Sequence, residues 1–494
     1  MRKLLLLTLL LLPATVHAQV EVVWNEPTRG VAIAVDADDN AYTVDYEYNP
    51  GGDITLTKRG ADGGLLWAST YNQTDNSKWD QATWVATDHG GNALVTGTVM
   101  SGYSNPVAAA SVLMKYSPGG QLLWRNVYES EFDGSYTTKC IVDQDDNIYV
   151  LGKGSGPAGH VTKVKKFAPD GSALWTYFDA DGIGAPINIK FAPDGDLVIT
   201  GRAIFGSING YARIDRDGQE VWSFPGVNSL TVGDAAGDQY GNTYLVHGVY
   251  ETGGGTTIKK LSPSGGLLWS QDYAMSAFRI EVGTDDCPVI CGYPNAGTPG
   301  AAFVKVDGDG ALLWANLDAD GPHTLLSHAR LMLDSANNAY LAAGLMTSQA
   351  VCKVSSGGAS EWTATIPGGG YALGIAIGTT NDVFVVGGTT AMLGQLNSAS
   401  APGIVASSRF ALHGGFPNPA TAATTIRYSL QREANVVLGL FDLSGREVRS
   451  LRRGVEGPGD KSVSYSVAGL AAGTYFYRLE VGGEVKAASI RIVR

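Results

Sequence analysis

A tryptophan that recurs along most of the chain constrains the fold more than any other feature of the sequence. Seven copies lie 45 to 57 residues apart: Trp67, Trp124, Trp175, Trp222, Trp269, Trp314 and Trp362. Nine residues before each of them stands a basic residue, namely Lys58, Lys115, Lys166, Arg213, Lys260, Lys305 and Lys353. A glycine-containing turn separates the two members of each pair. A strand, a tight turn and a second strand explain this fixed offset, so each copy predicts a β-hairpin.

A second signature alternates with the first. It is an acidic or polar turn followed by a tyrosine, and it is clearest at residues 36–42, 143–149, 238–244 and 334–340. Looser copies begin near Asp88, Ala192, Gly283 and Gly378. Aspartate, asparagine and glycine suit the left-handed backbone of such turns. Because a short apolar segment precedes each turn, every repeat is expected to hold four strands.

Four-stranded repeats of about this length are typical of the blades of a β-propeller. The innermost and third strands of the repeat each occur eight times, whereas only seven tryptophan strands follow a third strand. The segment Val22-Val23-Trp24 supplies the missing one, because it precedes the first innermost strand as the other tryptophan strands precede theirs. We therefore expect residues 19–397 to form an all-β, eight-bladed propeller whose N-terminal strand closes the last blade. A seven-bladed ring is the alternative.

The repeat resembles a known family. The pattern Asp…Gly-Asn-x-Tyr-x-x-Gly, followed by Lys-x-x-x-x-Gly-x-Leu-Trp, is similar to the β-propeller repeats called SBBP repeats, over roughly residues 20–397. That family is defined by its architecture, and the resemblance implies no catalytic residues. The Gly-x-Leu-Trp part also resembles the tryptophan motifs of eight-bladed quinoproteins, which bind PQQ above a calcium ion. This chain lacks the adjacent cysteines that often accompany that cofactor.

The two ends of the chain indicate export. Residues 1–18 combine Arg2 and Lys3 with an apolar run and a small-x-small motif before Gln19, as a secretory signal peptide does. Residues 398–415 are rich in Ser, Ala and Gly, which suits a linker. Residues 416–494 contain about seven short segments of alternating polarity, which predict a small Ig-like β-sandwich.

Three motifs in this last segment identify it as similar to the type A C-terminal sorting domain of the type IX secretion system of Bacteroidota. They are Phe416-Pro417-Asn418-Pro419, then Asp442, Gly445 and Arg446, then Gly473, Tyr475, Tyr477 and Arg478. The resemblance implies transport by that machinery, removal of the domain by its sorting peptidase, and a secreted or surface-attached product. A related Ig-like stalk module is the alternative.

Charge and cysteine content limit the partners. The formal net charge of -12 argues against nucleic acid as a ligand. The four cysteines are Cys140, Cys287, Cys291 and Cys352. Cys287 and Cys291 are too far apart along an extended strand to form a disulfide, so we expect buried free thiols. No segment after the signal peptide is long and apolar enough for a transmembrane helix.

Two long insertions, residues 71–84 and 128–138, predict where a ligand binds. They carry Trp79, Asp80, Trp84, Tyr128 and Tyr136, and the tryptophans break the blade pattern. Such aromatic residues can stack on a sugar ring or anchor a partner protein. Acidic neighbours in these loops favour neutral or cationic ligands. The alternative is that the tryptophans fill a wide propeller core.

Catalytic residues and a metal site are not predicted, because the histidines are scattered and no catalytic motif occurs. Calcium binding at the turn of Asp36, Asp38 and Asn40 is a minor alternative to a capped β-turn. The sequence thus favours a non-catalytic binding or adhesion module. The alternative is a secreted enzyme, either a lyase or hydrolase acting on polysaccharide or peptide or, less favoured, a quinoprotein dehydrogenase. Titratable groups with shifted pKa values that converge on the channel would favour that enzyme.

Overall fold

The computed structural model describes most of the chain. Its described ranges are 20–46, 52–72, 79–100, 109–129, 136–156, 159–179, 183–202, 208–228, 233–249, 255–294, 301–319, 329–344, 348–368, 370–395, 410–416, 420–430, 433–442, 446–481 and 484–493. The predicted signal peptide lies outside these ranges, as does the predicted linker up to residue 409. The chain divides into two compact units, Met1–Ala399 and Ser400–Arg494.

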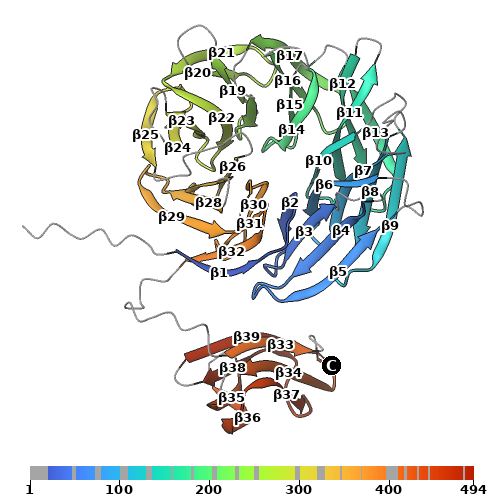
Figure 1. Ribbon diagram of the computed structural model, residues 1–494, viewed down its shortest axis with the longest axis vertical. Coiled ribbons are helices and arrows are strands. Elements are labelled where there is room, and N and C mark those ends of the chain that lie inside the picture. The colour runs from blue at the N-terminus through green and yellow to red at the C-terminus, as the bar shows by residue number, and fades with distance from the viewer. Residues whose placement is uncertain are drawn as a thin grey trace, which may run out of the picture. The chain divides into compact units, whose positions relative to one another are not determined.

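The first unit is all-β and repeats one four-stranded antiparallel sheet around a common centre (Figure 1). Seven of the described sheets use four consecutive strands. In chain order, the first sheet consists of β2 (Ala32–Val35), β3 (Ala41–Tyr46), β4 (Ile54–Arg59) and β5 (Leu65–Tyr71), and the second of β6 (Trp79–Thr87), β7 (Ala93–Met100), β8 (Ala109–Tyr116) and β9 (Leu122–Glu129). The third sheet consists of β10 (Tyr136–Val142), β11 (Ile148–Gly156), β12 (Gly159–Phe167) and β13 (Ala173–Phe178), and the fourth of β14 (Ala185–Phe191), β15 (Leu197–Arg202), β16 (Ile208–Ile214) and β17 (Glu220–Asn228). The fifth sheet consists of β18 (Asp234–Gly237), β19 (Thr243–Val249), β20 (Gly255–Leu261) and β21 (Leu267–Tyr273), and the sixth of β22 (Met275–Val282), β23 (Pro288–Pro294), β24 (Ala301–Val306) and β25 (Leu312–Ala319). The seventh sheet consists of β26 (Arg330–Leu333), β27 (Ala339–Gly344), β28 (Ser348–Val354) and β29 (Ser360–Pro367).

One further sheet joins the two ends of this unit. β30 (Gly374–Ile377), β31 (Val383–Val386) and β32 (Thr390–Gln395) are completed by β1 (Val20–Glu26), which pairs antiparallel with β32. Trp24 in β1 lies opposite Met392. The strand predicted to act as a missing outer strand therefore occupies that place in this sheet.

The recurring tryptophan links each sheet to the next. The indole Nε1 of Trp67 donates to the carbonyl of Pro118 in the β8–β9 turn, at 2.9 Å. Lys58, directly opposite Trp67 in the neighbouring strand, donates to the same carbonyl at 3.4 Å. Trp24 makes the equivalent bond to Ala61, at 3.0 Å, so β1 is held by the first sheet. The fixed offset between base and tryptophan thus places both donors at one acceptor.

A glycine in each receiving turn lies against the tryptophan ring. The pairs are Gly63 and Trp24, Gly120 and Trp67, Gly171 and Trp124, Gly218 and Trp175, Gly265 and Trp222, Gly310 and Trp269, and Gly358 and Trp314. All seven glycines have φ between +81° and +88°. A side chain here would meet both a strained backbone and the ring. Two of the recurring tryptophans, Trp222 and Trp362, have an Nε1 without an acceptor among the described residues. Trp222 still packs on Gly265, whereas Trp362 faces the sheet completed by β1, whose third and fourth strands are not joined by such a turn.

The acidic turns form a second set of links. Within each turn the aspartate caps its own loop; Asp36 Oδ1, for example, accepts from the backbone and the amide of Asn40, both at 2.9 Å. Lys58 lies 3.0 Å from the other oxygen of Asp36. Between sheets, four turn residues with positive φ accept a backbone N–H from the preceding sheet: Asp39 from Thr379, Asp146 from His89, Asp286 from Gln239 and Asn337 from Thr284. These contacts explain the turn signature by structure alone.

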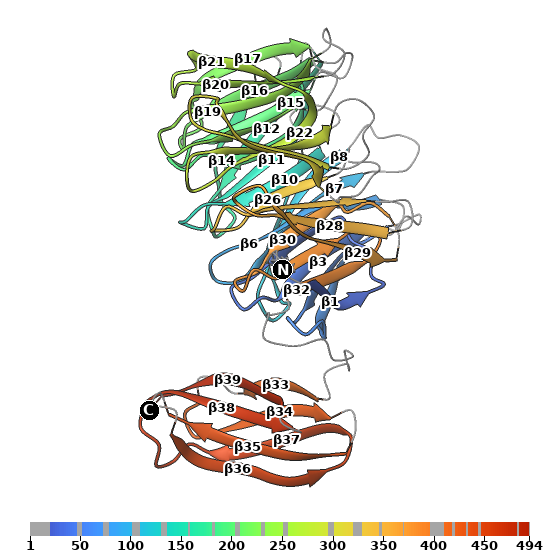
Figure 2. The ribbon, with the colours of Figure 1, turned by 90° about the vertical axis from the view of Figure 1, so that its left-hand side faces the viewer.

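The second unit contains two antiparallel sheets, whose strands are seen side-on in Figure 2. One sheet consists of β33 (Phe410–Phe416), β34 (Ala423–Leu430) and β37 (Gly459–Ser466). The other has the order β36 (Glu447–Glu456), β35 (Ala434–Phe441), β38 (Gly473–Val481) and β39 (Glu484–Ile492). Both contribute to one buried core, which includes Tyr428, Leu438 and Tyr477. β33 begins inside the segment expected to be a linker, because residues 410–416 pair with β34.

The link between tryptophan and glycine predicts different effects for two adjacent glycines. A Cβ at Gly120, where φ is +86°, would lie 2.7 Å from the Trp67 ring. At Gly119 the nearest atom to a Cβ is Ser117 Oγ, at 3.9 Å. We expect Gly120→Ala to lower the free energy of unfolding by about 2–4 kcal/mol and Gly119→Ala to change it by less than about 1 kcal/mol. Denaturant unfolding of the two variants measures this, and equal effects would contradict the proposed contact.

Candidate functional site

The predicted site residues do not form one cluster. Residues 79–84 and 136–138 belong to strands β6 and β10 rather than to loops, because pairing with the next strand continues to Trp79 and Tyr136. The expectation that these segments are loops was wrong at both places. Residues 73–78 and 130–135 lie outside the described residues, and so do the side chains of Trp79 and Tyr136.

The other three predicted residues occupy different environments. Asp80 is buried, and its backbone N–H donates to the Gly52 carbonyl at 2.9 Å. Tyr128 lies in the outer strand β9, where its ring packs 5.4 Å from that of Phe167. Trp84 lies in the innermost strand β6 and lines a central cavity. Of these three, only Trp84 is therefore placed to touch a ligand in that cavity.

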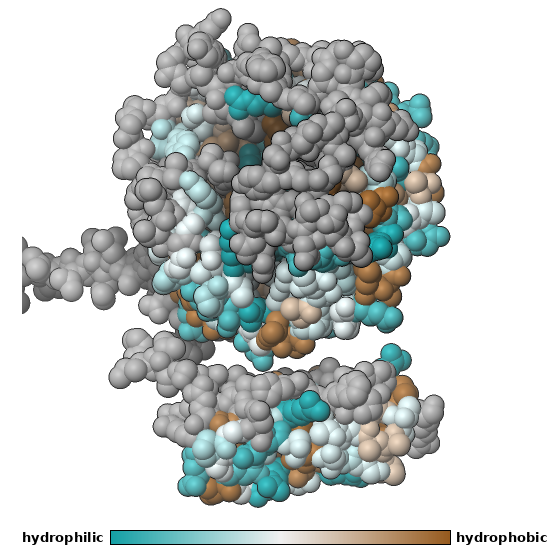
Figure 3. Space-filling view, turned by 45° about the vertical axis from the view of Figure 1, so that its right-hand side comes forward, coloured by the Kyte–Doolittle hydropathy of each residue, from teal (hydrophilic) through white to brown (hydrophobic). Residues whose placement is uncertain are grey.

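The cavity has a volume of about 950 Å³ and lies where the innermost strands meet. Residues of β2, β6, β10, β14, β18, β22, β26 and β30 line it. In the space-filling view of Figure 3, a hollow in the first unit shows both hydrophilic and hydrophobic residues. Cavities of this size with a few convergent polar groups are common ligand sites.

One position of the innermost strand distinguishes the eight sheets. It lies four residues before the first residue of the acidic turn. In chain order it is occupied by Ala32, Trp84, Lys139, Asn188, Asp234, Arg279, Arg330 and Gly374. The next position along each strand is apolar and mostly buried, as at Val85, Cys140 and Ile189. Six residues of the first set line the cavity, that is, all of them except Ala32 and Asp234. The second set packs mainly between the sheets and also reaches the cavity lining at several places, among them Ile33, Val85 and Ile375.

A β-bulge precedes this position in four of the strands. The pairing register shifts between Ala82 and Trp84, Thr137 and Lys139, Pro186 and Asn188, and Ala277 and Arg279. A bulge bends the strand and changes the direction of the side chain that follows. It is part of how these strands present this residue, and the one two positions later, to the cavity.

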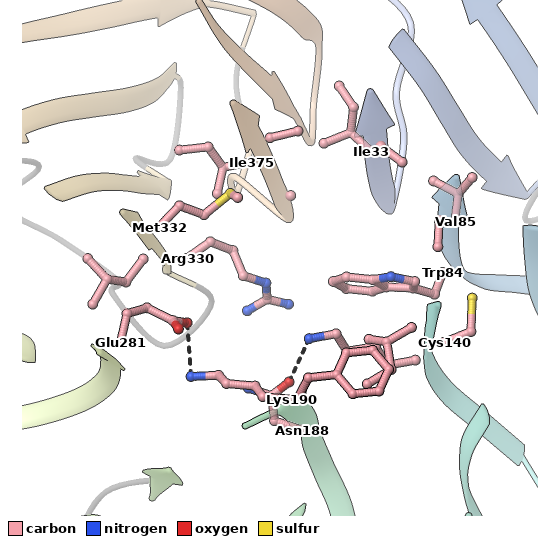
Figure 4. A pocket seen from close by; sticks show the side chains of 18 of the residues that line it. Ile33, Trp84, Val85, Cys140, Asn188, Lys190, Glu281, Arg330, Met332 and Ile375 are labelled. Atoms are coloured by element: carbon pink, nitrogen blue, oxygen red, sulfur yellow. Dashed lines mark hydrogen bonds and ion pairs between the residues drawn. The ribbon is translucent and has the colours of Figure 1, made fainter. Parts of the chain in front are cut away.

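The polar residues of the cavity form a connected chain of hydrogen bonds. Lys139 Nζ donates to Asn188 Oδ1 at 2.9 Å, and Asn188 Nδ2 donates to Asp234 Oδ1 at 3.0 Å. Lys190 lies 2.8 Å from the other oxygen of Asp234 and 2.9 Å from Glu281. Figure 4 shows the contacts of Asn188 with Lys139 and of Lys190 with Glu281, beside Trp84 and Arg330, whose side chains both extend into the cavity. Lys190 therefore engages both carboxylates.

The basic groups outnumber the acidic ones in this network. Lys139, Lys190, Arg279 and Arg330 face two carboxylates, those of Asp234 and Glu281. The ammonium of Lys139 also lies 5.1 Å from the centre of the Trp84 ring. The cavity thus carries an excess of positive charge, although the chain as a whole is acidic.

Burial shifts several pKa values in the network. Burial, together with the positive charge of Lys190, lowers the pKa of Lys139 to about 8. Burial and the neighbouring Arg279 lower the pKa of Arg330 to about 9. Burial raises the pKa of Glu281, and Lys190 opposes that rise. Burial would also raise the pKa of Asp234, but Lys190 and Arg279 lower it overall.

The opposite side of the cavity is apolar. Ile33, Met332 and Ile375 line it (Figure 4). With the Trp84 ring they provide a surface for the apolar face of a ligand. The described residues contain no group of three or more His, Cys, Asp or Glu side chains able to hold a metal ion. All four cysteines are free, and all but Cys287 are buried.

The sequence analysis missed Lys139, Lys190, Arg279 and Arg330. Their signal was nevertheless present, because each is a basic residue in the innermost strand, next to apolar residues such as Cys140, Ile189 and Leu331. Glu281 follows Arg279 by two residues, and Lys190 follows Asn188 by two, which is the strand period. Aligning the repeats on the first residue of the acidic turn would have shown that Lys139, Arg279 and Arg330 share one position, and that Lys190 and Glu281 share the position two residues later.

Comparison with known proteins identifies the C-terminal segment. Residues 415–493 match the family described as the secretion system C-terminal sorting domain. Its described motif residues are structural parts of the second unit: Arg446 Nε lies 3.1 Å from Asp442, and the Tyr475 hydroxyl donates to Ala471 at 3.1 Å. Pro417, Asn418, Pro419 and Gly445 lie outside the described residues. This match indicates export by the type IX system to the cell surface or the medium.

Solved structures similar to the chain include propellers, at low identity. The β-propeller domain of the trilobed protease from Pyrococcus furiosus is 9% identical, with a TM-score of 0.38, over 76% of this chain and 100% of that one. Prolyl oligopeptidase B from Galerina marginata is 10% identical, with a TM-score of 0.42, over 84% of this chain and 55% of that one. A protein of unknown function from Bacteroides caccae is 15% identical, with a TM-score of 0.31, over 49% of this chain and 81% of that one. No curated protein matches the chain.

Helices able to cross a membrane are not found in the described part of the chain. Residues 415–493 are thus similar to secretion-system sorting domains, and an all-β unit of repeated four-stranded sheets precedes them in the chain.

The lowered pKa of Lys139 predicts a pH-dependent stability. Lys139 is faced by Lys190, Glu281, Asp234 and Arg330. Its pKa falls from 10.5 to about 8 on folding, so protonation favours the unfolded chain. Below about pH 8 the folded chain bears the full free-energy cost of burying the charged Lys139. That cost disappears as the pH rises towards 10.5. We expect Lys139→Met to stabilise the chain at pH 7 by one to a few kcal/mol, since each pKa unit is worth about 1.4 kcal/mol.

Denaturant unfolding between pH 7 and 10 measures this difference. The advantage of Lys139→Met over the unmodified chain should shrink steadily above pH 8. Lys259→Met, which removes a lysine outside the cavity, is the control. A constant difference across this range would contradict a lowered pKa at Lys139.

Proposed function

We propose that the chain is an exported, non-catalytic binding protein whose first unit is an eight-bladed β-propeller of the SBBP-repeat type, closed by β1, and whose ligand occupies the central cavity. The strongest support is the one cavity-facing position that differs from sheet to sheet. The residues that link sheets repeat in nearly every blade, which assembly explains. Trp84, Lys139, Asn188, Asp234, Arg279 and Arg330 differ from most of their counterparts in the other blades, so a need that every blade shares does not explain them.

Three contacts support closure of the ring by β1. β1 pairs with β32, Trp24 donates to Ala61 in the first sheet, and Asp39 accepts from Thr379 in the last. A ring closed by a strand from the other end of the chain has no free sheet edge at its seam. Such a ring would hold the cavity-lining strands at fixed distances, as a ligand site requires.

The cavity also supports a second candidate, a secreted enzyme acting on polysaccharide or peptide. Lys139 and Glu281 converge on the cavity with shifted pKa values, which is the feature expected of an acid–base pair. Against this, Lys190 engages Glu281, and Lys139 already donates to Asn188. Both interactions give these groups a structural role, so we favour binding. Recovery of the bound saccharide in shortened or unsaturated form would favour the enzyme.

Replacement of Trp84 tests the proposed binding site. The chain without its predicted signal peptide, residues 19–494 and hereafter called the mature chain, is applied to an array of neutral and acidic oligosaccharides. Binding to the oligosaccharides that give a signal is then measured by calorimetry. We expect Trp84→Ala to weaken binding at least about tenfold, because a buried aromatic side chain contributes about 1.5–3 kcal/mol. Tyr240→Ala removes an aromatic residue that is 69% exposed, and should leave affinity unchanged.

Thermal unfolding of both variants shows whether each remains folded. Unchanged affinity in a folded Trp84→Ala variant would reject the cavity as the site. A large loss of stability would instead place Trp84 in the propeller core, which was the alternative from the sequence.

The sorting segment is tested by truncation. We propose that it directs the first unit through the type IX machinery and is then removed by the sorting peptidase. In a host with that machinery, the full chain should reach the surface or the medium and lose the segment, whereas a chain ending at residue 415 should stay in the periplasm. Cell fractionation and the mass of the exported protein measure both. Export of the truncated chain would contradict the proposal.

A further inference from the structure

We propose that the central cavity binds a saccharide that carries a carboxylate, with the carboxylate held by Arg279 and Arg330 and the sugar ring placed against Trp84. This inference rests on the proposed binding function and adds the chemical class of the ligand. It also reverses the preference for neutral or cationic ligands that the acidic loops indicated.

The first argument is the distribution of charge. Lys190 lies between Asp234 and Glu281 and makes contacts of 2.8 and 2.9 Å with them. Lys190 thus contacts both carboxylates of the network, and Asp234 also accepts from Asn188 and lies near Arg279. Lys139, Arg279 and Arg330 bring further positive charge to the same cavity, so four basic groups stand against two acidic ones. An anion from outside would reduce their mutual repulsion, which burial makes stronger.

The second argument is the geometry of the two arginines. They occupy equivalent positions on the neighbouring innermost strands β22 and β26. Arg279 donates to the neutral carbonyl of Phe278 at 2.7 Å, and Arg330 to that of Ala329 at 3.5 Å. Guanidinium groups bind carboxylates through two parallel hydrogen bonds, which makes arginine better suited to this anion than lysine. The Arg330 side chain extends into the cavity in Figure 4.

The third argument is the aromatic surface across the cavity. Trp84 stands two sheets before Asn188 and extends towards the side from which Arg330 comes (Figure 4). Lys139 lies over its ring at 5.1 Å and also donates to Asn188. An indole face with hydrogen-bonding groups beside it suits a ring that has one apolar face and several hydroxyls. A volume of about 950 Å³ accommodates a short oligosaccharide.

Calorimetry with three matched probes tests the inference on the mature chain. The probes are digalacturonate, its methyl ester and the corresponding neutral galactose disaccharide, which share a ring but differ in charge. We expect digalacturonate to bind at least about 30-fold more tightly than the ester. Its affinity should fall with added salt, and also as the pH rises above about 8, where Lys139 loses its proton.

Two variants test whether Arg279 and Arg330 hold the carboxylate. Arg279→Gln and Arg330→Gln should each weaken the binding of digalacturonate at least tenfold and leave the affinity for the ester nearly unchanged. Lys259→Gln, which lies outside the cavity, should change neither affinity. If a glutamine variant does not fold, Arg330→Lys keeps the charge and should still lose most of the preference for the acid.

The outcomes separate this inference from the proposed function. Equal binding of acid and ester, with both lost in Trp84→Ala, would overturn the anion preference and leave the binding function standing. Binding of none of the three probes would overturn the inference. Tighter binding of a sulfated disaccharide than of digalacturonate would also overturn it, since the anion would then not be a carboxylate.

Discussion

The contact on which the first unit depends is the packing of a tryptophan ring on the turn of the next sheet, which six of the tryptophans reinforce with an indole N–H bond. A four-stranded sheet of this size cannot bury both of its faces alone, so each must be fixed against its neighbours. The tryptophan, the lysine beside it and the glycine beneath the ring fix that contact at the outer edge, and the acidic turns fix it nearer the centre. Because Trp24 makes the same contact, the first and last sheets are linked in the same way.

Because these links lie elsewhere in the sheet, the amino-acid sequence of the innermost strands can differ from sheet to sheet. The links that recur from sheet to sheet lie in the turns and outer strands, whereas the polar links among cavity side chains join only some neighbouring sheets. The cavity can therefore hold a set of polar residues that would be costly elsewhere. The burial of Lys139 and Arg330 lowers their pKa values and is expected to cost stability. Such a cost is usual at sites shaped for a ligand rather than for assembly.

Much of the fold was predictable because repetition makes the signal strong. The tryptophan spacing, the turn glycines and the place of Val22 to Trp24 all follow from needs that every sheet shares. The site was harder to predict, because its residues occur once each. Trp84 was found as a departure from the pattern, whereas Lys139 and Arg330 resemble ordinary surface charges until the repeats are aligned. The segments 71–84 and 128–138 were expected to be loops, since sequence gives no sign that strand pairing continues to Trp79 and Tyr136.

A crystal structure of the mature chain with digalacturonate, at a concentration that saturates binding, tests the central claim most directly. The account predicts a carboxylate between the guanidinium groups of Arg279 and Arg330 and a sugar ring against Trp84. A ligand bound outside the cavity, for example along residues 73–78 or 130–135, would contradict it. So would a cavity that contains only water while the ligand is bound elsewhere.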